Sequence, residues 1–228
     1  MTCTLPAGSD LETGRKRIVA GVSEQKQRAK TLTQYLRAVF KGKLDPLASF
    51  LNGLGLMPNT VTILGLVGNT VAAIMIAMGQ ITLGGIIVLL MGPVDALDGT
   101  MARLRNEAGE FGAFVDSVTD RYSELVIMAG LLYYFLQQGN DLGVMLTFFA
   151  AGGSVLVSYV RARAQSLGVD SQIGILTRVE RYLVTAPMLI FNIPIYGLWV
   201  LAIFANLTAV QRILDVRRKF RSGAAGEA

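Results

Sequence analysis

The chain has 228 residues, of which 52% are hydrophobic and only 16% charged, and its mean hydropathy is +0.50. This composition excludes an ordinary soluble domain and suits a chain with several membrane spans. The formal net charge is +5; a single cysteine excludes an intramolecular disulfide, and the lack of histidine removes the usual general base and transition-metal ligand. Any acid–base chemistry must therefore use carboxylates, Lys, Arg or Tyr.

The N-terminal part of the chain is more polar than the rest. Residues 1–25 are predicted to be mobile, because they contain too little apolar surface to offset the entropy of ordering. No apolar stretch follows their basic residues, so no cleavable signal is expected. In residues 26–54, apolar side chains such as Leu32 and Leu36 recur at helical spacing opposite basic ones. This pattern predicts an amphipathic helix that lies on the membrane surface.

Six apolar runs follow, each near the length of about 20 residues that a helical span needs. They lie at about 59–79, 81–102, 112–137, 142–163, 180–192 and 195–214, of which the fifth is the shortest. The predicted fold is all-α: a polytopic membrane protein with six transmembrane helices, preceded by the interfacial amphipathic helix. The membrane domain is expected to occupy residues 55–215, and residues 216–228 form a basic tail.

The distribution of charge indicates an orientation. If the N-terminus is cytoplasmic, the outer connections fall near residues 79–82, 138–142 and 191–195, and they contain no Lys or Arg and one acid, Asp141. All 21 basic residues lie in the tails, the inner loops or near cytoplasmic helix ends. The positive-inside rule therefore predicts a multi-pass cell-membrane protein with both termini in the cytoplasm, and the positive charge suits anionic lipid. No basic stripe interleaved with aromatic residues indicates a nucleic-acid partner.

Four aspartates interrupt the second and third apolar runs. Asp95 and Asp98 are three residues apart, and Asp116 and Asp120 are four apart, so each pair shares a helix face. A tight cytoplasmic turn between the two runs allows the faces to converge. One carboxylate in a membrane helix costs about 2.5–3.5 kcal/mol, and converging like charges raise that cost.

Bound cations are one way to offset this cost. Four carboxylates without Cys or His favour Mg²⁺ or Mn²⁺ over zinc or copper. The alternative is that the acids pair with Arg103, Arg105 and Arg121, or are hydrated at the interface.

The residues around the acids form a recognisable pattern, D-x2-D-G-x2-A-R-x8-G-x3-D-x3-D. Its fixed positions are Asp95, Asp98, Gly99, Ala102, Arg103, Gly112, Asp116 and Asp120. This pattern resembles the signature of the CDP-alcohol phosphotransferases, membrane enzymes that move a phospholipid phosphate from a cytidine diphosphate donor to an alcohol and release CMP. The resemblance extends to "PNTVT" at residues 58–62 and to the six-span layout.

The resemblance implies roles for these residues. Asp95, Asp98, Asp116 and Asp120 are expected to hold two Mg²⁺ (or Mn²⁺) ions, and Asp120 is also the expected catalytic base. The expected donor-binding residues are Asn59, Thr62, Gly99, Ala102, Arg103, Gly109 and Gly112. Taken alone, the small residues suit close helix packing equally well, and Asn59 and Thr62 suit a helix cap.

A second group of polar residues concerns the acceptor alcohol. Several arginines near the cytoplasmic ends of the last three predicted spans suit a phosphate-bearing acceptor, although each one alone is equally explained by topology. The elements "SYVRARA" (158–164) and "RVER" (178–181) resemble those of phosphatidylinositol phosphate synthases and their archaeal counterparts. Carried over by position, the acceptor-binding residues are Ser158, Arg161, Arg163, Arg178 and Arg212.

The best prediction from sequence is a phosphatidyltransferase that joins inositol phosphate to CDP-diacylglycerol or CDP-archaeol. One alternative is the same reaction with glycerol 3-phosphate. Another, from a different class of protein, is a cation transporter with a pathway of intramembrane acids and arginines. Acids near one membrane face, instead of its midplane, favour the enzyme. The family also implies a homodimer.

Overall fold

The structure is a computed structural model that describes residues 45–105, 109–171 and 173–224. The predicted mobile N-terminus and residues 26–44 of the predicted amphipathic helix lie outside the described residues. The described residues are helical with short connections and contain no strand, which confirms the all-α prediction.

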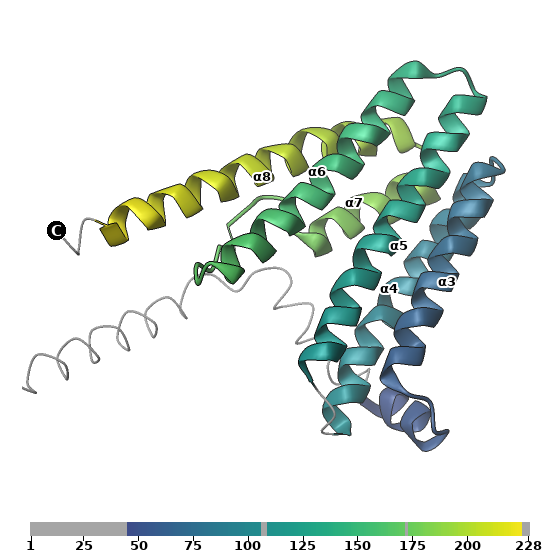
Figure 1. Cartoon of the computed structure of the whole chain (residues 1–228). Helices are drawn as coiled ribbons and strands as arrows, with labels where there is room; N and C mark the ends of the chain where they lie inside the picture. The colour runs from purple at the N-terminus through teal and green to yellow at the C-terminus, as the bar shows by residue number, and fades with distance from the viewer. Residues whose placement is uncertain (1–44, 106–108, 172, 225–228) are drawn as a thin grey trace, which may run out of the picture. The chain divides into compact units, whose positions relative to one another are not determined.

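A short helix at residues 45–53 precedes six longer ones. These are α3 (Pro58–Ala77), α4 (Ile81–Leu104), α5 (Glu110–Gln137), α6 (Asp141–Ser166), α7 (Arg178–Ile190) and α8 (Pro194–Ala224) (Figure 1). α3 begins with a proline, whose fixed φ suits the first helical turn and whose missing N–H is not needed there.

Tight turns join the helices at the end predicted to be outside the cell. Gly79 follows α3 with φ +84°, and Gly139 follows α5 with φ +62°. Both adopt the left-handed conformation that ends many helices and that glycine tolerates best. Asn192 takes a similar conformation, with φ 54°, between α7 and α8. The positions of these three turns match the predicted outer connections.

The helices pack in a defined order. α3 packs on both α4 and α5, α4 on α7, α5 on α6, and α8 on both α6 and α7 (Figure 1). One apolar core joins these helices, with fully buried side chains such as Ile76, Leu131 and Leu201. Gly85 of α4 lies against the backbone of Leu189 and Ile190 in α7, where a Cβ would overlap with it. This close approach brings α7 beside the half of α4 that precedes the acids.

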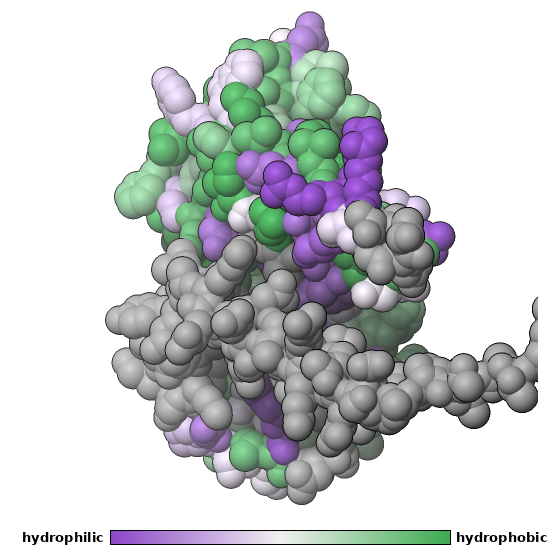
Figure 2. All heavy atoms as spheres, turned by 90° about the vertical axis from the view of Figure 1, so that its left-hand side faces the viewer, coloured by the Kyte–Doolittle hydropathy of each residue, from purple (hydrophilic) through white to green (hydrophobic). Residues whose placement is uncertain are grey.

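Four of the described helices are long and apolar enough to cross a membrane: α3, α4, α6, and α8 over Pro194–Ser222. α5 has the length, but acids and an arginine occupy its first half, and α7 has only 13 residues. Large apolar side chains cover much of the surface, among them Phe148 (62% exposed) and Leu90 (59%). Figure 2 shows this apolar surface beside a band of hydrophilic side chains. So much exposed apolar surface is typical of a membrane protein.

Candidate active site

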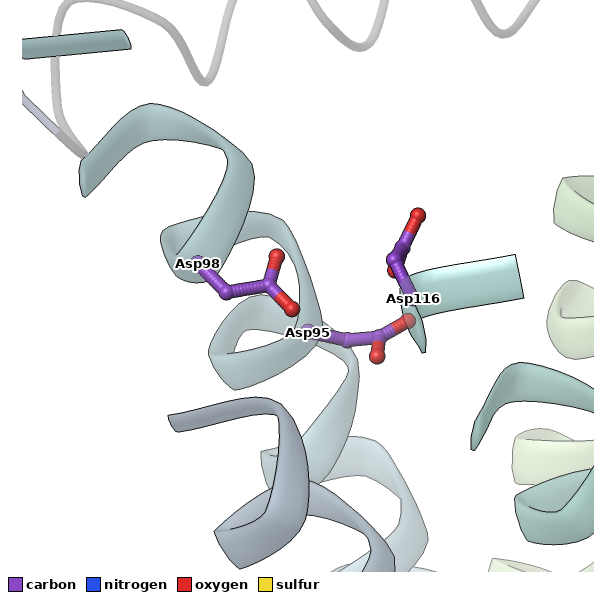
Figure 3. A group of neighbouring side chains, drawn as sticks. All are labelled: Asp95, Asp98 and Asp116. Atoms are coloured by element: carbon purple, nitrogen blue, oxygen red, sulfur yellow. The ribbon is translucent and has the colours of Figure 1, made fainter. Parts of the chain in front are cut away.

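Three acids from two helices come together. Asp95 and Asp98 project from α4, and Asp116 projects from α5 (Figure 3). One carboxylate oxygen from each lies within 4.8 Å of the others. The face of α4 that carries Asp95 and Asp98 therefore meets the face of α5 that carries Asp116, as the sequence spacing predicted. These three residues are called the acidic cluster below.

The acidic cluster fits a divalent cation. Its donors are all carboxylate oxygens, the ligands that Mg²⁺ and Mn²⁺ prefer, and no Cys or His stands among them. Three carboxylates in such proximity repel one another unless a positive charge lies between or beside them. Asp95, Asp98 and Asp116 are thus the described residues best suited to hold Mg²⁺ or Mn²⁺.

The fourth predicted ligand, Asp120, does not belong to this group of described acids but is linked to it. Asp120 is buried, with 7% of its surface exposed. The Nη2 atom of Arg178, from α7, pairs with both Asp95 and Asp120, and Arg121 Nη1 lies 3.3 Å from the other oxygen of Asp120. Of the arginines that the sequence offered as partners of the acids, Arg121 alone pairs with one of them among the described residues, whereas Arg178 was predicted to bind the acceptor. Arg103, by contrast, donates to Thr100 within α4, and Arg105 donates to backbone carbonyls.

Asp98 is the most tightly held member of the acidic cluster. It is 5% exposed, and its Oδ2 accepts a hydrogen bond from Thr62 Oγ1 at 2.5 Å while its Oδ1 accepts one from the Gly99 N–H. The Thr62 hydroxyl has one proton, and the carboxylate is a nearer and stronger acceptor than the Pro58 carbonyl at 3.2 Å. In the structure Thr62 therefore orients a predicted metal ligand, whereas the sequence assigned it to the donor.

The hydrogen bond from Thr62 to Asp98 can be tested by mutation. Thr62→Val is expected to lower Mn²⁺ affinity and kcat by about tenfold, because the Asp98 carboxylate loses the donor that orients it. Thr62→Ser keeps the hydroxyl and serves as the control. Manganese titration followed by electron paramagnetic resonance measures the affinity. A raised KM for the lipid donor with unchanged Mn²⁺ affinity would return Thr62 to the donor-binding role.

The predicted donor-binding glycines border open space. A Cβ built on Gly99 or Gly112 meets no described atom within 4 Å outside its own helical turn. Close packing against another of the described helices therefore does not explain these two residues. Asn59, in the first turn of α3, and Gly109, the N-cap of α5, are both exposed. Ala102 is half-buried on α4.

The predicted acceptor residues separate into two groups. Arg178 contacts the acids, whereas Arg212 is buried (3% exposed) and donates to the carbonyls of Val157 (2.7 Å) and Ile173 (2.8 Å). These two bonds join α8 to α6 and to the connection that follows α6. The remaining residues of the set lie on the last turns of α6: Ser158 is half-buried, Arg161 is exposed, and Arg163 is exposed and bonded to Ser166 of its own helix.

Guanidinium groups come from four helices: Arg121 from α5, Arg161 from α6, Arg181 from α7 and Arg212 from α8. Arg121 pairs with Asp120, and Arg181 pairs with Glu124, four residues further along α5. Guanidinium groups suit a phosphate.

Sequence reasoning missed two residues beside the site. Glu124 binds the buried Arg181 through two contacts, Oε1 to Nε at 2.6 Å and Oε2 to Nη2 at 3.1 Å, and so joins α5 to α7. Its position, four residues after Asp120, continues the spacing of Asp116 and Asp120 and could have identified it. Tyr182 of α7 was also missed. Both residues line a cavity together with Asp95, Asp120 and Arg178.

The fold and the acidic cluster define a class: an all-helical membrane protein with a site suited to a divalent metal. Comparison with known proteins identifies the family. Residues 55–211 match the CDP-alcohol phosphatidyltransferase family. The chain therefore belongs to this family and is a transferase enzyme, which favours the enzyme hypothesis over the transporter.

Individual relatives are similar over most of their length. The phosphatidylinositol phosphate synthase of Mycobacteroides abscessus is 35% identical over 190 residues, covering 79% of this chain and 86% of the relative. The archaetidylinositol phosphate synthase of Pyrococcus horikoshii is 32% identical over 189 residues, covering 82% of this chain and 98% of the relative.

Solved structures of one relative are also similar. Mycobacterium tuberculosis phosphatidylinositol phosphate synthase with CDP-DAG bound has a TM-score of 0.69 and 31% identity, covering 76% of this chain and 92% of that one. The same enzyme in complex with manganese and citrate also has a TM-score of 0.69, with 76% and 88% covered. Manganese in that structure agrees with a divalent metal as the cofactor of this family member.

Proposed function

We propose that this protein transfers a phosphatidyl group from CDP-diacylglycerol to inositol phosphate, with release of CMP. The observation that carries the proposal is the acidic cluster, formed by the residues of the family pattern and backed by Arg178. Relatives named phosphatidylinositol phosphate synthase at 31–35% identity support this acceptor over glycerol 3-phosphate. The archaetidylinositol phosphate synthase relative keeps CDP-archaeol as a possible donor.

In this reaction a hydroxyl of the acceptor attacks the phosphatidyl phosphorus of the donor. A new P–O bond forms, the P–O bond to the CMP phosphate breaks, and the hydroxyl proton goes to a base. We assign the base to Asp120, because it is buried beside the acidic cluster and the chain contains no histidine for this role. Arg178 and Arg121 hold its two oxygens, so its carboxylate is fixed in direction.

The other acids hold the cofactor in this proposal. Asp95, Asp98 and Asp116, with Asp120, would bind two Mg²⁺ or Mn²⁺ ions. When bound, these ions polarise the reacting phosphate and stabilise the charge on the leaving CMP. Thr62 and the Gly99 N–H keep Asp98 in place for this purpose.

In this proposal the two substrates bind to different residues around the acids. We place the nucleotide at Gly99, Ala102 and Gly112, since the open space beside the two glycines admits a diphosphate close to the backbone. Arg103, Gly109 and Asn59 complete this donor site. We assign the acceptor phosphate to Arg161, Arg178 and Arg212, and its ring hydroxyls to Ser158 and Arg163.

The proposed arrangement in the membrane has six spans with the site and both termini in the cytoplasm. α5 and α7 complete the six, because turns without Lys or Arg alternate with basic connections along the chain. Labelling of single cysteines introduced at positions 80, 139 and 192 from outside intact cells tests this orientation; protection of all three contradicts it. The homodimer implied by the family is tested by the mass of the detergent-solubilised protein.

The proposed reaction has a direct assay. Purified protein with Mg²⁺ and CDP-diacylglycerol is expected to release CMP when inositol phosphate is added, and to release none after chelation of the metal. Release with glycerol 3-phosphate alone would keep the family and reject the acceptor. Release of CMP from CDP-archaeol but not from CDP-diacylglycerol would show that CDP-archaeol is the donor. The absence of CMP with every phosphorylated or neutral alcohol would reject the catalytic proposal.

A further inference from the structure

The helix that carries Asp95 and Asp98 contains a proline. Pro93 lies inside α4, two residues before Asp95. Proline has no backbone N–H, so it cannot donate to the carbonyl of Leu89 four residues earlier, and its ring pushes that carbonyl aside. A carbonyl left without a donor inside a membrane protein is costly, and a helix without this bond bends easily.

The Tyr182 hydroxyl lies at this carbonyl. Its oxygen is 2.7 Å from the Leu89 oxygen and 3.1 Å from that of Val88, so the single proton goes to the nearer one. Gly92 allows this approach, since a Cβ at that position would overlap with the hydroxyl. Tyr182 thus supplies, from α7, the hydrogen bond that Pro93 removes from α4.

The position of α7 is itself tied to α5. Arg181, the neighbour of Tyr182, is buried and binds Glu124 of α5 through two nitrogens. The described residues show extensive packing of α4 and α5 on α3, but not of α4 and α5 on each other. α7 therefore connects, through Tyr182 and Arg181, the two helices whose acids must meet.

We propose that Tyr182 is a positioning residue for the metal site: its hydroxyl replaces the missing N–H of Pro93 and fixes the direction of the acid-bearing half of α4. The inference rests on the proposed function, because it takes Asp95 and Asp98 to be metal ligands. Tyr182 itself acts through the helix backbone and through no substrate atom.

Removal of the hydroxyl tests this role. Tyr182→Phe is expected to weaken Mn²⁺ binding, measured by electron paramagnetic resonance of free Mn²⁺, by about five- to tenfold, since the Leu89 carbonyl loses its donor. The kcat falls by a similar factor while the KM values of both substrates stay within about twofold of wild type. Tyr196→Phe, at a position that is 71% exposed on α8, is the matched control.

A second variant separates positioning from general stability. Pro93→Ala restores a backbone N–H that can donate to Leu89, so Tyr182→Phe in that background is expected to cost less than about twofold in Mn²⁺ affinity. An equal loss in both backgrounds, or a double variant that fails to fold, would overturn the inference. If wild-type protein binds no Mn²⁺, the proposed function fails; if wild type and Tyr182→Phe bind it equally, only the role of Tyr182 fails.

Discussion

Asp120→Asn is expected to lower kcat by about a thousandfold while the lipid donor still binds. General base catalysis contributes about 10²–10⁴-fold in enzymes, and an amide cannot accept the hydroxyl proton. The side chain keeps nearly the same shape, its amide oxygen can still ligate a cation, and the residues assigned to the nucleotide on α4 and at the start of α5 do not include Asp120. Turnover is measured as CMP release, and donor binding by equilibrium dialysis with labelled CDP-diacylglycerol.

The control for this prediction is Asp141→Asn, the same change in the first turn of α6, remote from the acids. It should leave kcat within about twofold of wild type, as most surface substitutions do. If Asp120→Asn retains full turnover, another group is the base, and Glu124 is the next carboxylate on the same helix face. Loss of donor binding in Asp120→Asn would instead show that Asp120 is needed to bind the donor, directly or through an ion that it ligates.

Local patterns predicted much of the fold. Apolar runs at 59–79 and 81–102 correspond to α3 and α4, since a helix long enough to span a membrane must be apolar over most of its length. Helix ends were less predictable. The last apolar run ends at 214, but α8 continues to Ala224, because the charged residues there favour a helix without making it apolar.

The acidic cluster was also accessible from local patterns, since spacings of three and four residues fix which acids share a face. Contacts between residues far apart in the sequence could not be predicted from such patterns. Thr62 meets Asp98 across 36 residues, and Arg178 meets Asp95 across 83. Such pairs depend on how helices pack, and sequence periodicity carries no information about partners on another helix. The same holds for Tyr182, whose partner is a backbone carbonyl exposed by Pro93.

Arg178→Gln is expected to have opposite effects on the two ligands of the site. In the structure its guanidinium neutralises Asp95 and Asp120, so it competes with any cation that these acids bind. The variant should therefore bind Mn²⁺ as well as wild type or more tightly, since like charges left unpaired attract a cation more strongly.

The same substitution is expected to weaken binding of the acceptor. In the proposed function, bound ions would neutralise Asp95 and Asp120 and leave the Arg178 guanidinium to bind the acceptor phosphate. Its removal is expected to raise the KM for inositol phosphate by about 10- to 100-fold, the loss of a charge-assisted contact at a partly exposed side chain, with a smaller change in kcat. Arg217→Gln, at an exposed position on α8, controls for the lost charge. Weaker Mn²⁺ binding with an unchanged KM for inositol phosphate would show that Arg178 orients the acids and does not bind the acceptor. The acceptor phosphate would then depend on Arg161 and Arg212.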